Sequence, residues 1–190
     1  ATTTGGDNTA VGVSALLANT TAASNTAVGK SALAANTTGT DNVAVGADAL
    51  DANTTGSDNT AIGDNALGAA QTSSANTAVG SGALLVSTGS SSTAIGAYAL
   101  DANTTGSSSV AVGKDALGAN TTGNENTAVG EGAMEDNTTG STNVAIGREA
   151  LADNTTASGN TALGYDAMRV NTAGADNVAV GGYALDANTT

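Results

Sequence analysis

The sequence predicts an all-β protein, a parallel β-solenoid of about 11 coils in which one 17-residue repeat makes one coil. The first observation is that a glycine preceded by alanine and an aliphatic residue recurs every 17 residues, except for one interval of 16 between Gly80 and Gly96. The second is that the residues around this glycine hardly change from repeat to repeat, although the chain has no Pro, Cys, Phe or Trp. Such self-similarity is typical of repeat architectures whose units pack on their neighbours. We therefore expect residues 1–190 to form a single repeat domain, part of a longer fibre.

Each coil is expected to contain two short strands. In Asn-Thr-Ala-Val-Gly, period-two alternation places Thr and Val on one face and Asn, Ala and Gly on the other, and β-branched residues favour a strand. After the glycine comes x-x-Ala-Leu, for which a one-turn helix is the alternative to a second strand, although two recurring apolar residues make a poor helical stripe. The variable Asn-Thr-Thr-Gly segment, which contains the one-residue deletion, is expected to be the outer loop. Its glycines would supply positive φ: Gly39, Gly56, Gly106, Gly123 and Gly140.

Three sets of residues are assigned to the core: the recurring alanines, an aliphatic residue before each marker glycine, and a Leu or Met four residues after it. The aliphatic column is Val11, Val28, Val45, Ile62, Val79, Ile95, Val112, Val129, Ile146, Leu163 and Val180. The Leu/Met column is Leu16, Leu33, Leu50, Leu67, Leu84, Leu100, Leu117, Met134, Leu151, Met168 and Leu185. A further column of asparagines, from Asn8 to Asn177, is expected to form an amide ladder that Ser92 and Ser109 interrupt.

Composition excludes several classes of function. Four basic residues against a net charge of −13 disfavour nucleic acid and direct contact with an anionic membrane. Without His or Cys, the usual general base, thiol nucleophile and soft metal ligands are missing, so we expect no enzyme, no cofactor and no metal site. The Asp-Asn steps at Asp7, Asp41, Asp58 and Asp176 are interpreted as turns, with calcium binding as the alternative.

Small residues dominate each coil, so one chain buries little apolar surface. Alanine and glycine repeated without exception would let another backbone approach closely, and self-association through that face is expected. Asn-Thr-Thr also matches the N-glycosylation sequon at eight positions, but its period equals that of the coil, which favours a structural role.

The columns resemble the head repeat of the YadA-like trimeric autotransporter adhesins, most clearly at NVAVG (42–46), SVAVG (109–113) and NVAIG (143–147). The longer ALxxNTTGxxNTAxG wording also resembles segments of bacteriophage tail fibres. The resemblance covers essentially the whole chain. It implies a left-handed β-roll and a homotrimer around one axis. It also implies an extracellular location on a bacterial cell or virion surface, and attachment to a host-surface protein, matrix protein or glycan. The coil here is about three residues longer than the usual family coil, and the sequence contains no heptad stalk and no membrane anchor.

Two other functions are kept open: an ice-binding protein built on stacked threonines, and a structural spacer within a fibre. No residue is assigned to catalysis. Tyr98, Tyr165 and Tyr183, in the variable positions after the glycine, are the candidate exposed contacts, with simple packing at the edge of the coil as the alternative.

Overall fold

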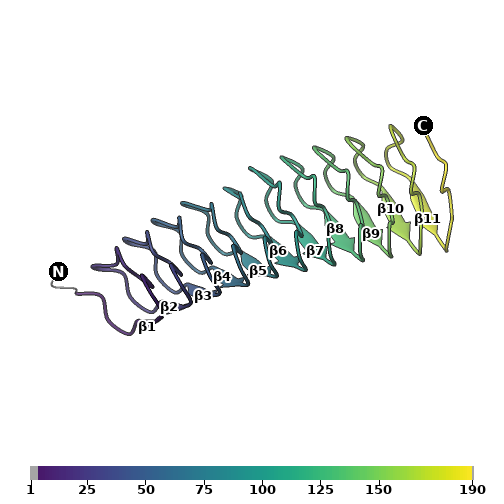
Figure 1. Ribbon diagram of the computed structural model, residues 1–190. Helices are drawn as coiled ribbons and strands as arrows, with labels where there is room; N and C mark the ends of the chain where they lie inside the picture. Colours follow the sequence, from purple (N-terminus) through teal and green to yellow (C-terminus); the bar gives the residue numbers. More distant parts are fainter. Residues whose placement is uncertain (1–3, 190) are drawn as a thin grey trace.

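The computed structural model describes residues 4–189 as a straight β-solenoid whose strands follow one another along one side of a rod (Figure 1). Eleven strands form one sheet, and each strand is three residues long. They are β1 (Thr9–Val11), β2 (Thr26–Val28), β3 (Val43–Val45), β4 (Thr60–Ile62), β5 (Thr77–Val79), β6 (Thr93–Ile95), β7 (Val110–Val112), β8 (Thr127–Val129), β9 (Val144–Ile146), β10 (Thr161–Leu163) and β11 (Val178–Val180). The described part of the chain contains no helix, so the one-turn helix is excluded.

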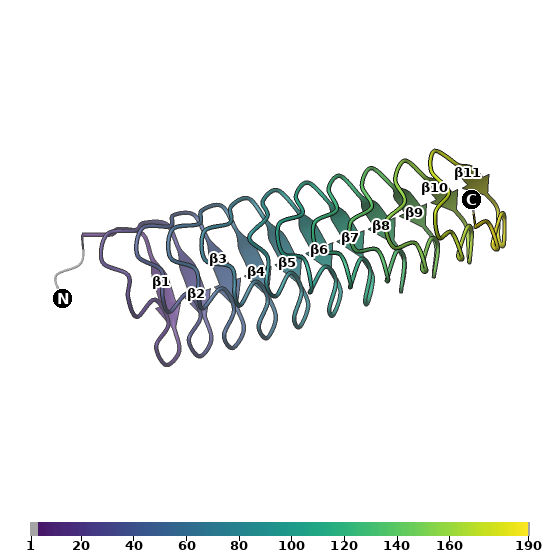
Figure 2. The ribbon, with the colours of Figure 1, turned by 90° about the horizontal axis from the view of Figure 1, so that it is seen from above.

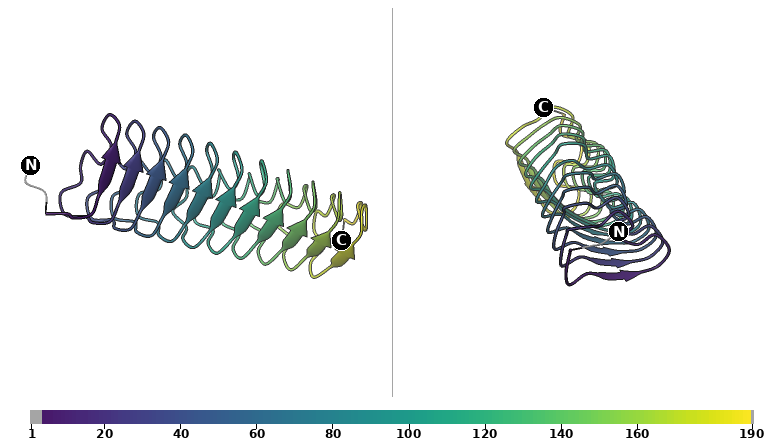
Figure 3. Two further views of the ribbon diagram at one scale, coloured as in Figure 1. Left: turned by 90° about the horizontal axis from the view of Figure 1, so that it is seen from below. Right: turned by 90° about the vertical axis from the view of Figure 1, so that its left-hand side faces the viewer.

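All neighbouring strands are parallel and follow the order of the sequence, so like residues lie side by side along the rod (Figures 2 and 3). In β3 and β4, for example, Ala44 pairs with Ala61 and Val45 with Ile62. The predicted parallel stacking with a 17-residue period is confirmed. The short repeat keeps this register because its missing residue lies in the loop. There Oγ1 of Thr88 donates to the carbonyl of Thr104 in the next coil at 2.7 Å. The first loop threonine of other coils makes the equivalent bond to its own next coil.

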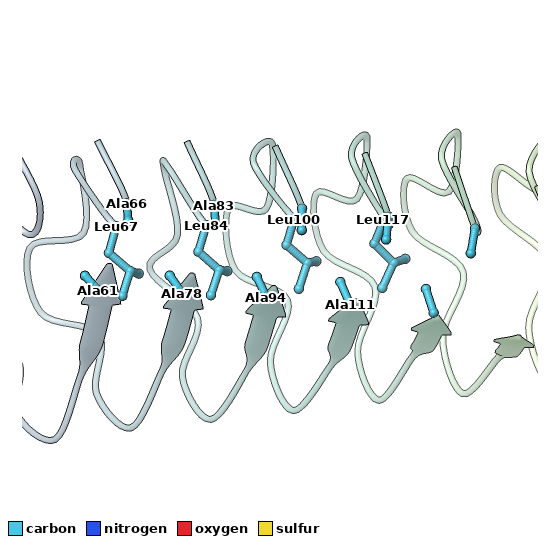
Figure 4. Packing of buried hydrophobic residues seen from close by; sticks show 14 of the residues in the cluster. Ala61, Ala66, Leu67, Ala78, Ala83, Leu84, Ala94, Leu100, Ala111 and Leu117 are labelled. Carbon is cyan, nitrogen blue, oxygen red and sulfur yellow. The ribbon is translucent and has the colours of Figure 1, made fainter. Parts of the chain in front are cut away.

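The interior of the coil is filled by the Leu/Met column and by two columns of alanine. From Leu33 to Met168 the Leu/Met side chains are fully buried, whereas Leu16 is 8% exposed and Leu185, in the last coil, is 50% exposed. Figure 4 shows each leucine pointing across its coil toward the alanine of a strand, as Leu100 does toward Ala94. Leucine therefore faces alanine across a narrow coil, and a larger residue at the strand position would have no space.

The asparagine before each strand forms the predicted amide ladder inside the coil. Oδ1 of Asn25 accepts hydrogen bonds from the backbone N of Asn42 at 3.0 Å and from its Nδ2 at 3.1 Å, and Asn42 accepts the same pair from Asn59. Ser92 and Ser109 interrupt the bonds between side-chain amides, as predicted, but the backbone bonds of the ladder continue, because the backbone N of Ser109 donates to Oγ of Ser92 at 3.3 Å.

A second ladder, which the sequence analysis missed, runs through the loop asparagines. Nδ2 of Asn53 donates to Oδ1 of Asn36 at 3.0 Å, and Asn120 donates to Asn103 in the same way at 2.9 Å. Both ladders are buried, so each amide gains partners that replace water. This ladder is broken at Ala70, which stands where the other loops have Asn or Ser.

The expected second strand is replaced by a run of turns. Its residues alternate between right-handed and left-handed backbone, with φ of 56° at Ser31 and 51° at Leu33, so they cannot extend. Hydrogen bonds between coils nevertheless continue: the backbone N of Leu33 donates to the carbonyl of Ala49 at 3.0 Å. Every residue of the Leu/Met column has φ between 49° and 54°, and these bonds to the next coil hold the strained conformation in place.

Two glycine columns recur for different reasons. The marker glycine after each strand has φ from 123° to 142°, and a Cβ on Gly113 would lie 2.5 Å from the carbonyl carbon of Gly130. The loop glycines, predicted to supply positive φ, do not have it. Space is short at this position, because a Cβ on Gly39 would lie 2.6 Å from Oδ1 of Asn36 and still closer to the carbonyl oxygen of Gly56. Other coils nevertheless carry Ala22, Ser73 and Ala157 there.

Candidate functional surface

The outward side of the sheet is a regular surface along the rod, and we call it the sheet face. It consists of the first residue of each strand, which is Thr or Val, and the third, which is Val, Ile or Leu. The middle alanine points inward and is fully buried from Ala27 to Ala162. No strand residue is charged, so the sheet face is an uncharged stripe along the described part of the rod.

The assignment of the aliphatic column to the core is wrong for the single chain. Its side chains are half-buried or exposed: Val45 is half-buried, Ile95 is 41% exposed and Ile146 is 39% exposed. The predicted alternation was right, but the side that faces inward is the one with Asn and Ala. The asparagine amides need partners that the interior supplies, and alanine is small enough to lie beneath leucine, so Thr and Val point outward.

Charged side chains gather on the turns after the strands. Four ion pairs form there: Lys30–Asp48 at 3.5 Å, Arg169–Glu149 at 3.3 Å, Lys114–Asp115 and Arg148–Glu149. All four basic residues of the chain take part in them. Because these side chains are exposed to water, each pair contributes little to stability.

Burial, with smaller effects of neighbouring acids, raises the pKa of three carboxyl groups on this side. Partial burial, followed by the nearby Asp48, raises the pKa of Asp51, and burial also raises the pKa of Asp101. Burial and the negative charge of Asp115 raise the pKa of Glu135. Among the described residues, no three His, Cys, Asp or Glu side chains come together in a way that would hold a metal ion.

The three tyrosines are all exposed, and two of them form a cluster. Tyr165 and Tyr183, 41% and 61% exposed, meet edge to face with ring centroids 5.2 Å apart. The guanidinium of Arg148 lies 5.4 Å from the centre of the Tyr165 ring and donates to its Oη at 2.9 Å. Tyr98 is 48% exposed and stands apart, with its ring against Gly82 of the preceding coil.

The loop asparagines are inaccessible to modification in the folded protein. Asn36, Asn53, Asn103, Asn120, Asn137 and Asn154, six of the eight sequon asparagines, are buried in the second ladder. The hydroxyl of the threonine that follows is also bonded: Thr121 donates to the carbonyl of Thr138 at 2.9 Å. Burial of the amide therefore supports the structural reading of Asn-Thr-Thr.

No family model, curated protein or solved structure matches the chain. Within residues 4–189 there is also no helix long and apolar enough to cross a membrane. The sheet face and the tyrosine cluster are the two candidate functional surfaces among the described residues.

Proposed function

We propose that the chain is a non-enzymatic segment of a homotrimeric, surface-displayed fibre that supports attachment to a host cell, matrix protein or glycan. In this proposal the coil is a left-handed β-roll, and three chains pack their sheet faces around one axis outside a bacterial cell or on a virion. The observation that carries it is the sheet face itself, a stripe of aliphatic residues and threonines that is uncharged and repeated in register from β1 to β11.

A solenoid that stayed single would leave this stripe in water. Contiguous exposed apolar patches larger than a few hundred Å² generally mark interaction sites. The exposed side chains of the sheet face include Ile62, Ile95 and Val110, at 37–41% exposure. Because like residues lie side by side along the whole sheet, a contact made by one coil is repeated by every other coil, and many weak contacts sum to a stable interface.

The shared surface differs from the one expected from sequence. Alanine and glycine were expected to face the partner chain, but the strand alanines are buried within their own coil. The distribution of charge favours the sheet face as the surface shared between chains. All charged side chains lie outside the strands and would remain in water when three sheet faces meet. The outer surface of such a fibre would be acidic and well hydrated.

Sedimentation equilibrium tests the assembly, with an expected mass of about three times the 17.8 kDa of one chain. The double variant Ile62→Asp/Ile95→Asp should sediment as a monomer with an unchanged circular dichroism spectrum, because both side chains point out of the coil. Thr38→Asp/Thr55→Asp, on exposed loop residues of two coils, is the matched control and should stay trimeric. A monomeric wild-type chain would refute the shared axis.

Attachment is tested with beads coated with the trimer and incubated with bacterial or animal cells. Retention above that of uncoated beads is expected. If the trimer forms but the beads adhere to no surface, the segment is a spacer and the attachment role fails.

One observation favours ice binding as the second candidate. Threonine hydroxyls in the loops are occupied, since Thr54 and Thr138 donate to carbonyls of the next coil at 3.0 Å. No hydroxyl hydrogen bond among the described residues comes from a strand threonine, so Thr60, Thr77 and Thr93 present a regular hydroxyl array to solvent. Thermal hysteresis from a monomeric wild-type chain, abolished in Thr77→Asp/Thr93→Asp, would decide for ice binding over the trimeric fibre.

A further inference from the structure

The coils of β9, β10 and β11 carry a side-chain cluster that other coils lack. It lies on the turns after these strands, away from the sheet face, and consists of Arg148, Glu149, Tyr165, Asp166, Arg169 and Tyr183. At the corresponding positions most other coils have Ala, Ser, Asp, Lys or Gly, so the general demands of the repeat do not require aromatic residues there. Two of the three aromatic residues of the chain are therefore in contact with each other on an otherwise small and acidic surface.

The polar groups of the cluster are arranged around the exposed rings. Glu149 accepts from Arg148 and forms an ion pair with Arg169, and Arg148 also donates to Oη of Tyr165. Two arginines and two carboxylates, Glu149 and Asp166, give the cluster no net formal charge in a chain of charge −13.

Asp166, which follows Tyr165 directly in the sequence, has an unsatisfied acceptor. The residue is 8% exposed, and its Oδ1 is buried without any hydrogen-bond partner. Tyr183 occupies the same position one coil further on. Buried acceptors without donors are rare in folded proteins, and one beside exposed tyrosines indicates a place where a ligand donates.

We infer that this cluster is a binding subsite for a neutral sugar ring of a surface oligosaccharide. A pyranose has an apolar C–H face that stacks on an aromatic ring and hydroxyls at its rim that donate and accept hydrogen bonds. The rings of Tyr165 and Tyr183 supply the first surface, and Asp166 and Arg148 supply acceptor and donor at its edge. Since each arginine is already paired with Glu149, an anionic ligand would have to displace an existing ion pair, which favours a neutral ligand.

The size of the cluster favours a sugar over a protein partner. Stable protein interfaces bury about 800 Å² on each side, with 20–30 residues a side, whereas this cluster has six residues on three coils. No pocket forms among the described residues and the cluster offers one or two rings, so a single site would bind weakly. Three copies in the proposed trimer would raise the apparent affinity through multivalency. The inference deepens the proposed attachment function and rests on it.

Intrinsic tyrosine fluorescence tests the site, because the chain has three tyrosines and no tryptophan. The full chain is titrated with maltohexaose, cellohexaose, chitohexaose and mannohexaose. At least one is expected to change the fluorescence saturably, and Tyr165→Ala and Tyr183→Ala should each weaken its binding tenfold or more, measured by calorimetry. Tyr98→Ala is the matched control, since Tyr98 holds the position of Tyr183 in another coil and should be dispensable. Asp166→Ala should keep its melting temperature and lose binding. No saturable change with any of the four sugars, or equal loss in Tyr98→Ala, would overturn the site.

The bead assay separates this inference from the proposed function. If beads coated with Tyr165→Ala/Tyr183→Ala adhere as well as wild-type beads, the sugar site is wrong and the attachment function stands. If wild-type beads adhere to nothing, the attachment function fails, while the sugar titration still reports on the site.

Discussion

The side-chain amides of Asn42 and Asn53 donate to one and the same acceptor, the carbonyl oxygen of Gly56, at 2.9 and 3.0 Å. These residues belong to different ladders, so Gly56 connects the two rows of asparagine across the interior. The same pairing recurs at Gly140, which accepts from Asn126 and Asn137. A coil with little apolar material is thus stabilised by a buried polar network in which most side-chain groups have partners.

Repairing the break in this network should stabilise the protein. Ala70 and Ser73 replace the usual Asn and Gly, and Oγ of Ser73 is buried without a hydrogen-bond partner. The double variant Ala70→Asn/Ser73→Gly restores the ladder and removes the unsatisfied hydroxyl. We expect a gain of about 1–3 kcal/mol in the free energy of unfolding, measured by urea denaturation.

Both single variants complete a double-mutant cycle and should show coupling, because the two side chains are neighbours: a Cβ on Gly140, at the position of Ser73, would lie 2.4 Å from Oδ1 of Asn137. Ala69→Asn, on the exposed neighbouring residue, is the control and should leave stability unchanged. A double variant no more stable than the wild type would argue against the ladder as a source of stability.

The marker glycine should be irreplaceable, whereas a nearby glycine in the same coil should not. Gly113→Ala would place a methyl group against the carbonyl of Gly130 at a φ of 139°, and we expect a loss of roughly 3 kcal/mol or more. Gly118 has no positive φ, and a Cβ there would lie no closer than 3.3 Å to a neighbouring atom, so Gly118→Ala should change stability by less than about 1 kcal/mol. Equal melting temperatures for the two variants would contradict the packing described here.

The period of the sequence was sufficient to predict parallel stacking, the loop position of the deletion and the first amide ladder. It could not decide which face of the strand points inward, because Thr-x-Val and Asn-x-Ala-x-Gly alternate equally well. Hydrophobicity alone predicted that the aliphatic column is buried. A coil of 17 residues, however, has room in its interior for one leucine and two alanines beside the asparagine amides. The positive φ of the leucines could not be predicted from the sequence either. Leucine rarely adopts this backbone conformation, and hydrogen bonds between coils impose it here.

Substitutions of the leucine and of the valine in the same coil should therefore differ in how much stability they cost. Leu117 is fully buried and Val112 is half-buried on the sheet face. Leu117→Ala should cost about 2–5 kcal/mol, and Leu117→Asp should disrupt the central coils by burying a charge. Val112→Ala should cost less than about 1 kcal/mol in monomeric protein. Chemical denaturation of monomers checks this, and a larger loss for Val112→Ala than for Leu117→Ala would reverse the assignment of the two sides.

Replacing a threonine that has positive φ should stabilise the protein by relieving backbone strain. Thr142 is exposed and has φ of 58°, and the corresponding residue of the next coil is Gly159 with φ of 76°. Because asparagine tolerates this conformation better than a β-branched residue, Thr142→Asn should raise the free energy of unfolding by about 0.5–1 kcal/mol. Thr139→Asn, at an exposed loop threonine without positive φ, is the control. A stabilisation of the same size in both variants would show that backbone strain is not the cause.

Stability should rise as the pH falls from neutral toward about pH 4, where carboxyl groups begin to protonate. The pKa values of Asp51, Asp101 and Glu135 are raised in the folded protein; the ordinary pKa of an aspartate is 3.8. The folded state therefore holds these protons more tightly than the unfolded state. Their contribution is greatest below the unfolded pKa and is lost as the pH rises through the higher folded pKa. In Asp51→Asn/Asp101→Asn/Glu135→Gln, the melting temperature at neutral pH should be higher and its increase toward pH 4 smaller than in the wild type. The increase that remains in this variant reports the repulsion among the other acids of the chain. If the melting temperatures of wild type and variant change in parallel with pH, these three groups are not its source.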